Sequence, residues 1–412
     1  MTVAVSIGLL VFQWLGQGEG LIPSELYPAG WPPRQYPTML HRAIVDGVTN
    51  NDPPEGLMIA HDPVRTAFGV LLASSNGPTA DEVREAMTVP SQSTDPNQLA
   101  YTDPRNLKPF SDKFNESSYI GAYVPPQLEI RPEYEEEIRD MDVDLVPSFD
   151  NGTMERLLDK LTAISKELSD SLSSDDIPYR LRLQPEVFIV TAASFKAVWA
   201  DADFHIENRR MREFNVDERR RTYVDTLYSL AKRRQVAHLH GLRATMLLLP
   251  LKDSRVQFMV LLPDLINGLR QLEKELEFVD LRGLLGVKMD TRRYDVRLPL
   301  IRIVTNLELA DNLGFLGIRQ AFNPKNADLS QITGQRERLW VRRFPHLTYF
   351  TLNEHGINVR RNKSMAGTRV IHNGETRNHF YASHPFFFAM LDEHKIYATG
   401  RYGQLAVDPD DM

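Results

Sequence analysis

The sequence predicts one α+β domain. Helix-like patterns dominate the first 185 residues and strand-like patterns dominate the remainder, so the order differs from the regular βαβ alternation of a parallel-sheet protein. After a proline-rich start over residues 21–55, no internal repeat, low-complexity linker or change of composition divides the chain. The chain has 412 residues, of which 42% are hydrophobic, and can therefore bury a large core.

Helices are predicted where apolar residues recur with helical spacing or where a helix-start signal stands. Pro63 lies in the first turn of an apolar segment that extends to Ser75, a position that proline favours. Thr79 and Glu82 have the spacing of a capping box, which predicts that a second helix begins there. The other helical segments cover residues 39–48, 134–141, 154–172, 269–285 and 307–316.

Strands are predicted where short runs are rich in β-branched and aromatic residues. The run from Pro185 to Trp199 is apolar and indicates a buried strand. The run from Tyr294 to Val304 alternates between apolar and polar residues, which is typical of a strand with one buried face. The remaining strand-like runs cover residues 235–240, 244–250, 256–263, 347–352, 386–391 and 396–401.

Composition and motifs exclude several classes of function. The chain has no cysteine, which removes disulfides, thiol nucleophiles and cysteine-ligated zinc. Its net charge of −7 argues against a nucleic-acid-binding protein, because binding phosphates requires a basic surface. The sequence contains no nucleotide-binding loop, zinc-binding helix or nucleophile elbow.

The N-terminus predicts secretion. Residues 3–15 form an apolar run broken only by Ser6 and Gln13, and three glycines follow by residue 20. This pattern is typical of a signal peptide over residues 1–20, which would leave residues 21–412 as the domain. The run is too short to span a bilayer, so no membrane anchor is expected. A buried N-terminal strand or helix is the alternative, because no basic residue precedes the run.

Three kinds of surface feature are candidates for modification or binding. Three Asn-x-Ser/Thr triplets agree with an extracellular location. They are candidate glycosylation sites at Asn115, Asn151 and Asn362. His238 and His240 could share one face of a strand, but two ligands are too few for a metal site, and surface histidines are the favoured interpretation. Basic clusters could bind a sulfated polysaccharide, although solvated loop charges are favoured; they lie at residues 209–212, 219–221 and 232–234.

A series of short phrases, in a fixed order along the chain, resembles the serpin family. The run from Thr191 to Lys196, with Trp199 beyond it, resembles the family's "N-A-x-x-F-K-x-x-W". Asn353-Glu354-His355-Gly356 resembles the "N-E-x-G" that precedes the reactive loop. Further matching phrases lie at residues 214–216, 298–300, 313–333, 339–346, 380–388 and 400–401. The resemblance covers about residues 37–402 and is best after residue 185.

The resemblance implies a serpin fold, which is usually monomeric. This is one domain of three β-sheets and eight or nine helices, with an exposed reactive loop at about residues 356–379. In inhibitory serpins a serine protease cleaves this loop, which then inserts as a new strand in the central sheet and carries the acyl-enzyme with it. The switch releases stored strain, requires no cofactor and involves no catalysis by the inhibitor.

The hinge, which the resemblance places from Glu354 to Lys363, is poorly suited to this insertion. Inhibitory members carry small residues here, whereas this chain carries large and charged ones. The side chains that would face the core in one register are Ile357, Val359, Arg361 and Lys363. In the other register they are Asn358, Arg360 and Asn362. Either register buries cations or amides, and an unpaired buried charge costs several kcal/mol.

The region beneath the opening sheet also departs from the family. Asp62 and Arg65 stand at the family's "S-P-x-S" helix start, and His346 matches the histidine that normally bonds those serines. A contact of Asp62 with His346 or with Arg65 could substitute for that bond. Thr191 replaces an asparagine, and Pro345 lies in the strand that would pair with the inserted loop, where proline is disfavoured. The candidates for the shutter and breach, the regions where the sheet would open to admit the loop, are Asp62, Arg65, Thr191, Trp199 and His346.

Counting along the loop locates the candidate scissile region. Counting forward from Gly356 places the cut near Val370, and counting back from Phe380 places it near Ile371. Arg369 is close to both and would suit a trypsin-like protease, although it is equally well explained as an exposed loop arginine.

Two functions follow from these observations. The first is a secreted serpin that does not trap proteases and acts as a binding, carrier, signalling or decoy protein. The second is a working inhibitor of a trypsin-like serine protease. The composition of the hinge favours the first. A small-ligand carrier, as one form of the first, has only family precedent to support it.

Overall fold

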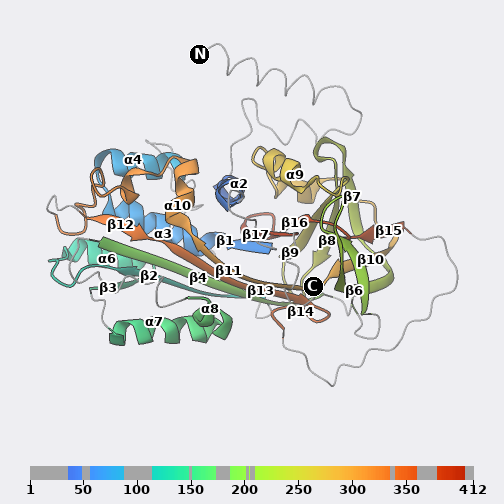
Figure 1. Ribbon diagram of the computed structural model, residues 1–412, viewed down its shortest axis with the longest axis horizontal. Helices are drawn as coiled ribbons and strands as arrows, with labels where there is room; N and C mark the ends of the chain where they lie inside the picture. The colour runs from blue at the N-terminus through green and yellow to red at the C-terminus, as the bar shows by residue number, and fades with distance from the viewer. Residues whose placement is uncertain are drawn as a thin grey trace, which may run out of the picture.

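The computed structural model describes residues 36–48, 56–87, 114–147, 151–172, 186–200, 204, 209–334, 339–359 and 378–403. These residues form three β-sheets and eight α-helices, which confirms the α+β serpin architecture that the resemblance implied. Most of the helices gather at one end of the molecule, and the two smaller sheets lie toward the other end (Figure 1).

The central sheet contains the two strands between which the loop would insert. Its order is β11 (Ile301–Glu308), β13 (Pro345–Asn353), β14 (Gly356–Ile357), β4 (Glu186–Val198), β2 (Phe114–Tyr123) and β3 (Asp144–Val146), and β12 (Trp340–Arg343) also pairs with β4. The strands β13 and β4 run parallel and pair directly over residues 346–349 and 191–194. Farther along, the short strand β14 lies between them and is antiparallel to both.

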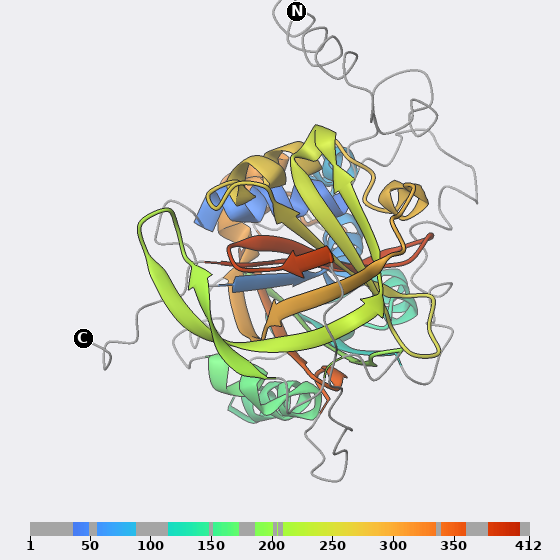
Figure 2. The same cartoon turned by 90° about the vertical axis from the view of Figure 1, so that its right-hand side faces the viewer.

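The other two sheets complete the core. The six-stranded sheet has the order β1 (Gly56–Ala60), β17 (Ile396–Tyr402), β16 (Phe386–Leu391), β9 (Gln257–Pro263), β8 (Ala244–Pro250) and β7 (Gln235–Leu239). The four-stranded sheet has the order β15 (Asn378–Tyr381), β10 (Arg293–Pro299), β6 (Arg221–Arg233) and β5 (Arg210–Asn215). Figure 2 shows the hairpin of β5 and β6, in yellow-green, curving across this side of the molecule.

Both faces of the central sheet are covered. One face packs on α3 (His61–Ser74) and on the six-stranded sheet, where the rings of Phe258, Phe350 and Phe388 lie against one another. The other face packs on α7 (Asn151–Ile164) and α8 (Lys166–Ser171), which contribute Leu161 and Leu168 to that layer. Because both faces of the sheet are covered, successive residues of β4 are buried from Glu186 to Phe195, and most of them are apolar.

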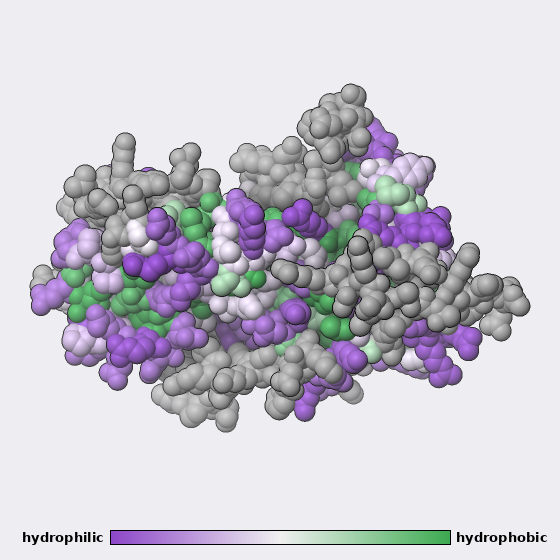
Figure 3. Space-filling model, turned by 90° about the horizontal axis from the view of Figure 1, so that it is seen from below, coloured by the Kyte–Doolittle hydropathy of each residue, from purple (hydrophilic) through white to green (hydrophobic). Residues whose placement is uncertain are grey.

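The remaining helices lie around this framework. They are α2 (Tyr36–Val48), α4 (Gly77–Ala86), α6 (Pro132–Asp140), α9 (Leu269–Leu276) and α10 (Leu309–Asn312). Seen from the side that α7 and α8 cover, the surface is mainly hydrophilic, with hydrophobic side chains visible between the polar ones (Figure 3). None of the helices in the described ranges combines the length and apolar character needed to cross a bilayer.

Several predicted elements are divided in the structure. The helix predicted over residues 154–172 is two helices that break at Ser165. The strand predicted over residues 294–304 is two strands, β10 and β11, which belong to different sheets. The helix predicted over residues 269–285 ends at Leu276, and a separate 3₁₀ turn follows at Gly283–Gly286. A uniform pattern of apolar residues conceals such breaks because both pieces remain in the core.

The predicted capping box is wrong. Helix α4 begins at Gly77, and the side chain of Asn76 accepts the bond from the Gly77 amide. Thr79 is buried within the helix, where its hydroxyl accepts a bond from the Asp328 amide, and Glu82 binds amides of a neighbouring turn. The two side chains that suggested a cap therefore bind other parts of the chain.

Candidate functional site

The start of the reactive loop lies inside the central sheet. In β14, Ile357 stands opposite Leu352 of β13 and Ala197 of β4. Its side chain is fully buried in the core that contains Phe350. In Figure 1, β14 is seen where β13 ends, at the right-hand end of the sheet. The hinge is therefore partly inserted, as a strand of two residues.

Gly356 is required by the close approach of this strand to β4. Its φ angle is +143°, a main-chain conformation that residues other than glycine rarely adopt. A Cβ atom at this position would lie 2.0 Å from the carbonyl oxygen of Ala197. No rotation of a side chain can relieve a contact with the main chain, so only glycine fits between these strands.

Trp199 holds the turn that connects β13 to β14. Its indole Nε1 donates a hydrogen bond to the carbonyl oxygen of Asn353 at 3.0 Å, and its amide donates to the carbonyl oxygen of His355 at 3.3 Å. The indole ring packs edge-on against Phe204 and Phe258. Glu354 is buried within this turn. The structure therefore brings Trp199 of the predicted breach together with the turn that contains Glu354 of the predicted hinge.

His346 fixes the middle of the central sheet. Its ring is fully buried, and Nε2 accepts a hydrogen bond from the amide of Ala60 at 3.1 Å. Because Nε2 is an acceptor, Nδ1 carries the proton and donates to the Thr191 hydroxyl at 2.9 Å. The Thr191 hydroxyl lies 3.5 Å from the carbonyl oxygen of Pro345. Burial lowers the pKa of His346 to about 3, so the imidazole is neutral at physiological pH.

Asp62 contacts one predicted partner, Arg65, and one that was not predicted, Lys395. Its carboxylate forms an ion pair with Lys395, from the turn between β16 and β17, and lies 3.9 Å from Arg65. The predicted contact with Arg65 is confirmed, whereas His346 binds Ala60 and Thr191 instead. Burial, aided by the Asp62 carboxylate, raises the pKa of the nearby Glu116 to about 8. No local pattern indicated Lys395 or Glu116, because their partners are distant along the chain.

A family model described as "Serpin (serine protease inhibitor)" matches residues 44–404. The chain belongs to the serpin family. The hinge glycine, Trp199 and the buried histidine described above all lie within that match.

Named serpins align with the chain at low identity. Serpin B10 of Papio anubis is 26% identical over 58% of this chain and 58% of its own length. The leukocyte elastase inhibitor of Bos taurus is 24% identical over 83% of this chain and 90% of its own. Several of the curated relatives that the chain matches, including serpin B10, align over only 54–58% of their own length. The structure of Serpin48 from Tenebrio molitor matches with a TM-score of 0.72 and 18% identity, over 90% of this chain and 97% of that one.

Pro345 is not the obstacle that the sequence suggested. It is the first residue of β13, where a missing amide proton is tolerated, and it pairs with Glu308 of β11 at the start of the ladder. The remaining residues predicted for the loop of this serpin lie outside the described residues: Arg360, Arg361, Asn362, Lys363, Arg369, Val370 and Ile371.

The structure describes two of the candidate glycosylation sites and several arginines of the basic clusters. Asn115 is exposed on β2, which suits an acceptor for a glycan, and Asn151 is the first residue of α7. Three arginines of the basic clusters are paired with acidic residues: Arg209 with Asp225, Arg220 with Asp217 and Arg221 with Glu213. This pairing reduces the charge available to a sulfated polysaccharide.

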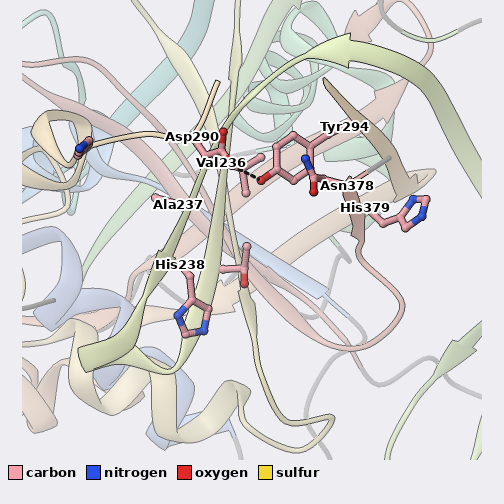
Figure 4. Close-up of a pocket in the computed structure, with 9 residues that line it drawn as sticks. Val236, Ala237, His238, Asp290, Tyr294, Asn378 and His379 are labelled. Carbon is pink, nitrogen blue, oxygen red and sulfur yellow. Dashed lines mark hydrogen bonds between the residues drawn. The ribbon is translucent and has the colours of Figure 1, made fainter. Parts of the chain in front are cut away.

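An open pocket of about 630 Å³ lies where β7 and β8 approach β10 and β15 (Figure 4). The hydroxyl of Tyr294 donates to Asp290 there, at 3.1 Å. His238 lines the pocket, but Nε2 contacts the Asp264 carboxylate and Nδ1 contacts His240. In the described part of the chain, no group of three or more histidine or acidic residues could hold a metal ion. The structure therefore agrees with the interpretation of His238 and His240 as surface histidines.

The buried histidine predicts a loss of stability in acid. The unfolded chain binds a proton at residue 346 below about pH 6.5, whereas the folded chain does so only near pH 3. Stability is therefore lost as pH falls through this window, by about 2 kcal/mol at pH 5. Urea unfolding at pH 7 and pH 5 measures the loss. The variant His346→Gln should lose about 2 kcal/mol less than the wild type over this range, and equal losses would contradict the assignment.

The glycine of the hinge gives a second prediction. Gly356→Ala should expel β14 from the sheet, expose Ile357 and lower the free energy of unfolding by about 3 kcal/mol. Gly317→Ala is the matched control, since Gly317 also has a positive φ of 92° but no atom within 4 Å of the added Cβ. It should cost only about 1 kcal/mol of backbone strain. Urea unfolding compares the two variants, and equal costs would show that the contact with Ala197 is unimportant.

Proposed function

We propose that this serpin does not trap proteases by loop insertion. It acts instead as an extracellular binding, carrier or signalling protein, or as a decoy that is cut without forming a trap. The observation that supports this proposal most strongly is the register of β14, because it determines which loop residues would face the core if the strand became longer.

The register of β14 supports one of the two alternatives for which loop residues would face the core. Ile357 faces the core, and side chains alternate along a strand, so residues 359, 361 and 363 would follow it inward. If the pairing of β14 continued along β13 and β4, Arg361 would lie between Thr348 and Ala193. Lys363 would lie between His346 and Thr191. All four of these neighbours are fully buried.

Lys363 would enter the least favourable place in the sheet for a cation. Insertion of a strand between β13 and β4 would break the bond between His346 Nδ1 and the Thr191 hydroxyl. This Nδ1 carries a proton, because Nε2 accepts from Ala60, so it cannot accept a bond from the ammonium group of Lys363. A buried charge without a partner costs several kcal/mol. Each new hydrogen bond of an inserted strand contributes about 1 kcal/mol. Two buried cations therefore offset most of what the strand would gain.

An inhibitor of a trypsin-like serine protease is the second candidate function. The family description and the name of the leukocyte elastase inhibitor support it, as does Arg369 in the candidate scissile region. The hinge glycine is also present. A protease could therefore bind and cut the loop under either proposal, and the difference lies in what the loop does afterwards.

We also propose that the protein is secreted and monomeric. The apolar run over residues 3–15 and the exposed position of Asn115 support secretion. Expression in eukaryotic cells, followed by mass spectrometry of the protein in the medium, should show a chain that begins near residue 21. Retention of the intact N-terminus inside the cell would contradict secretion.

The proposal predicts cleavage without covalent capture. Incubation with a panel of trypsin-like proteases should produce a cut near Arg369 and no complex that survives SDS electrophoresis, because the loop cannot carry the acyl-enzyme away before it hydrolyses. The variant Arg369→Ala is the matched control and should lose that cut. An SDS-stable complex of the wild type with any of these proteases would show that the second function is the correct one.

A further inference from the structure

Asn358 lies at a point in the central sheet that we call the fork. There β14 ends, and beyond it β13 and β4 pair directly with each other. The two long strands pair directly over residues 346–349 and 191–194, and they are separated by β14 at residues 352–353 and 197–198. Asn358 follows β14 directly, with a φ angle of +49°. This left-handed conformation is rare for residues other than glycine, although asparagine tolerates it better than most, and it turns the main chain away from the strand direction.

The side chain of Asn358 completes the ladder that its own main chain leaves. In a regular antiparallel pair, the residue opposite Thr351 would exchange two main-chain hydrogen bonds with it. The Asn358 amide donates to the Thr351 carbonyl oxygen at 2.9 Å, as expected. The Thr351 amide, however, donates to the side-chain Oδ1 of Asn358 at 2.6 Å, and the Thr351 hydroxyl donates to the same oxygen at 2.9 Å. The side-chain carbonyl thus replaces the main-chain carbonyl.

The nitrogen of the same carboxamide binds the other strand. Nδ2 donates to the carbonyl oxygen of Phe195 at 2.7 Å and to the hydroxyl of Ser194 at 3.0 Å, both on β4. It also lies 3.1 Å from the carbonyl oxygen of Tyr349 on β13. One side chain therefore supplies both an acceptor and donors to two strands, as the next residue of an inserted strand would do with its main chain.

A second asparagine fixes the direction in which the chain leaves the sheet. Nδ2 of Asn353 donates to the carbonyl oxygen of Val359 at 2.8 Å, and its Oδ1 accepts from the amide of His355 at 2.8 Å. Asn353 thereby ties Val359 to the turn between β13 and β14. Within the described part of the chain, these side-chain bonds of Asn353 go to Val359 and His355 and not to β4, so Asn353, unlike Asn358, does not bridge the fork.

We propose that Asn358 is a stop residue that limits the inserted strand to Gly356 and Ile357. To continue the strand, Asn358 must become extended and lose all five side-chain contacts before the following residues gain any partner. The same contacts keep the base of the loop in the sheet. This inference rests on the proposed function and deepens it, because it adds a barrier that is independent of the charges on Arg361 and Lys363.

Hydrogen exchange on the intact chain tests the stop residue directly. In Asn358→Ala the Thr351 amide loses its acceptor, so exchange at Thr351 and its neighbours in β13 should become about tenfold faster or more. Asn353→Ala is the matched control, and it should leave the exchange rate at Thr351 close to that of the wild type. Equal rates in the wild type and in Asn358→Ala, or equal acceleration in both variants, would overturn the proposal.

A conservative variant separates hydrogen bonding from shape. Asn358→Asp retains the size of the side chain, but its carboxylate would face the carbonyl oxygens of Phe195 and Tyr349 without a proton to donate. Exchange at Thr351 should therefore be fast at neutral pH and should slow toward the wild-type rate in acid, after correction for intrinsic exchange. A pH-independent ratio to the wild type would show that the carboxamide does not act through these bonds.

A second experiment tests whether Asn358 limits insertion after the loop is cut. Three chains are cut near residue 369, with the site verified by mass spectrometry: the wild type, Arg361→Ala/Lys363→Ala, and the same double variant with Asn358→Thr added. The unfolding midpoint of each is measured before and after cutting. Only the triple variant should become more stable, by several degrees or more, because it lacks both the charges and the stop.

The outcomes separate the two proposals. A gain in the double variant would show that Asn358 does not stop the strand, and no gain in the triple variant would show that it is not the limiting residue. Either result overturns the inference and leaves the wild-type result unaffected. If the wild type itself gains stability on cutting, the proposed function fails, whereas the exchange experiment still decides whether Asn358 closes the fork of the intact sheet.

Discussion

The pairing of β13 with β4 is the interaction on which the rest of the site depends. It is made in the middle of the sheet, where Nδ1 of His346 donates to the Thr191 hydroxyl and both residues are fully buried. The other ring nitrogen of His346 accepts from Ala60 at the start of α3, so one neutral imidazole joins the sheet to the helix beneath it. Any strand that entered from β14 would first have to separate this pair.

The acidic groups Asp62 and Glu116, beside the central sheet, have either a cationic partner or a raised pKa. Asp62 has Lys395 and Arg65 as partners, and burial raises the pKa of the Glu116 carboxyl, which favours its neutral form. Arg361 and Lys363 would enter a part of the sheet that offers them Ala193, Thr348, a threonine hydroxyl and a proton-bearing imidazole nitrogen. The same physics that stabilises the existing ion pair therefore disfavours a longer inserted strand.

The sequence predicted the fold well and the details of the site only partly. Spaced phrases such as the one ending at Trp199 indicated the serpin architecture, whereas β2 and β6 were missed because polar residues interrupt their patterns. The register of the hinge depends on how closely Gly356 approaches Ala197, which no local pattern records. The function of Asn358 depends on its left-handed main chain and on four residues from two strands, so its sequence neighbours could not indicate it.

A crystal structure of the chain after its loop has been cut would show whether the loop inserts. We expect Asn358 still to bridge Thr351 and Phe195 and His346 still to bind Thr191, with the strand between β13 and β4 no longer than two residues. A cut chain in which residues 358–363 form a strand between β13 and β4, with Lys363 beside His346, would contradict this expectation.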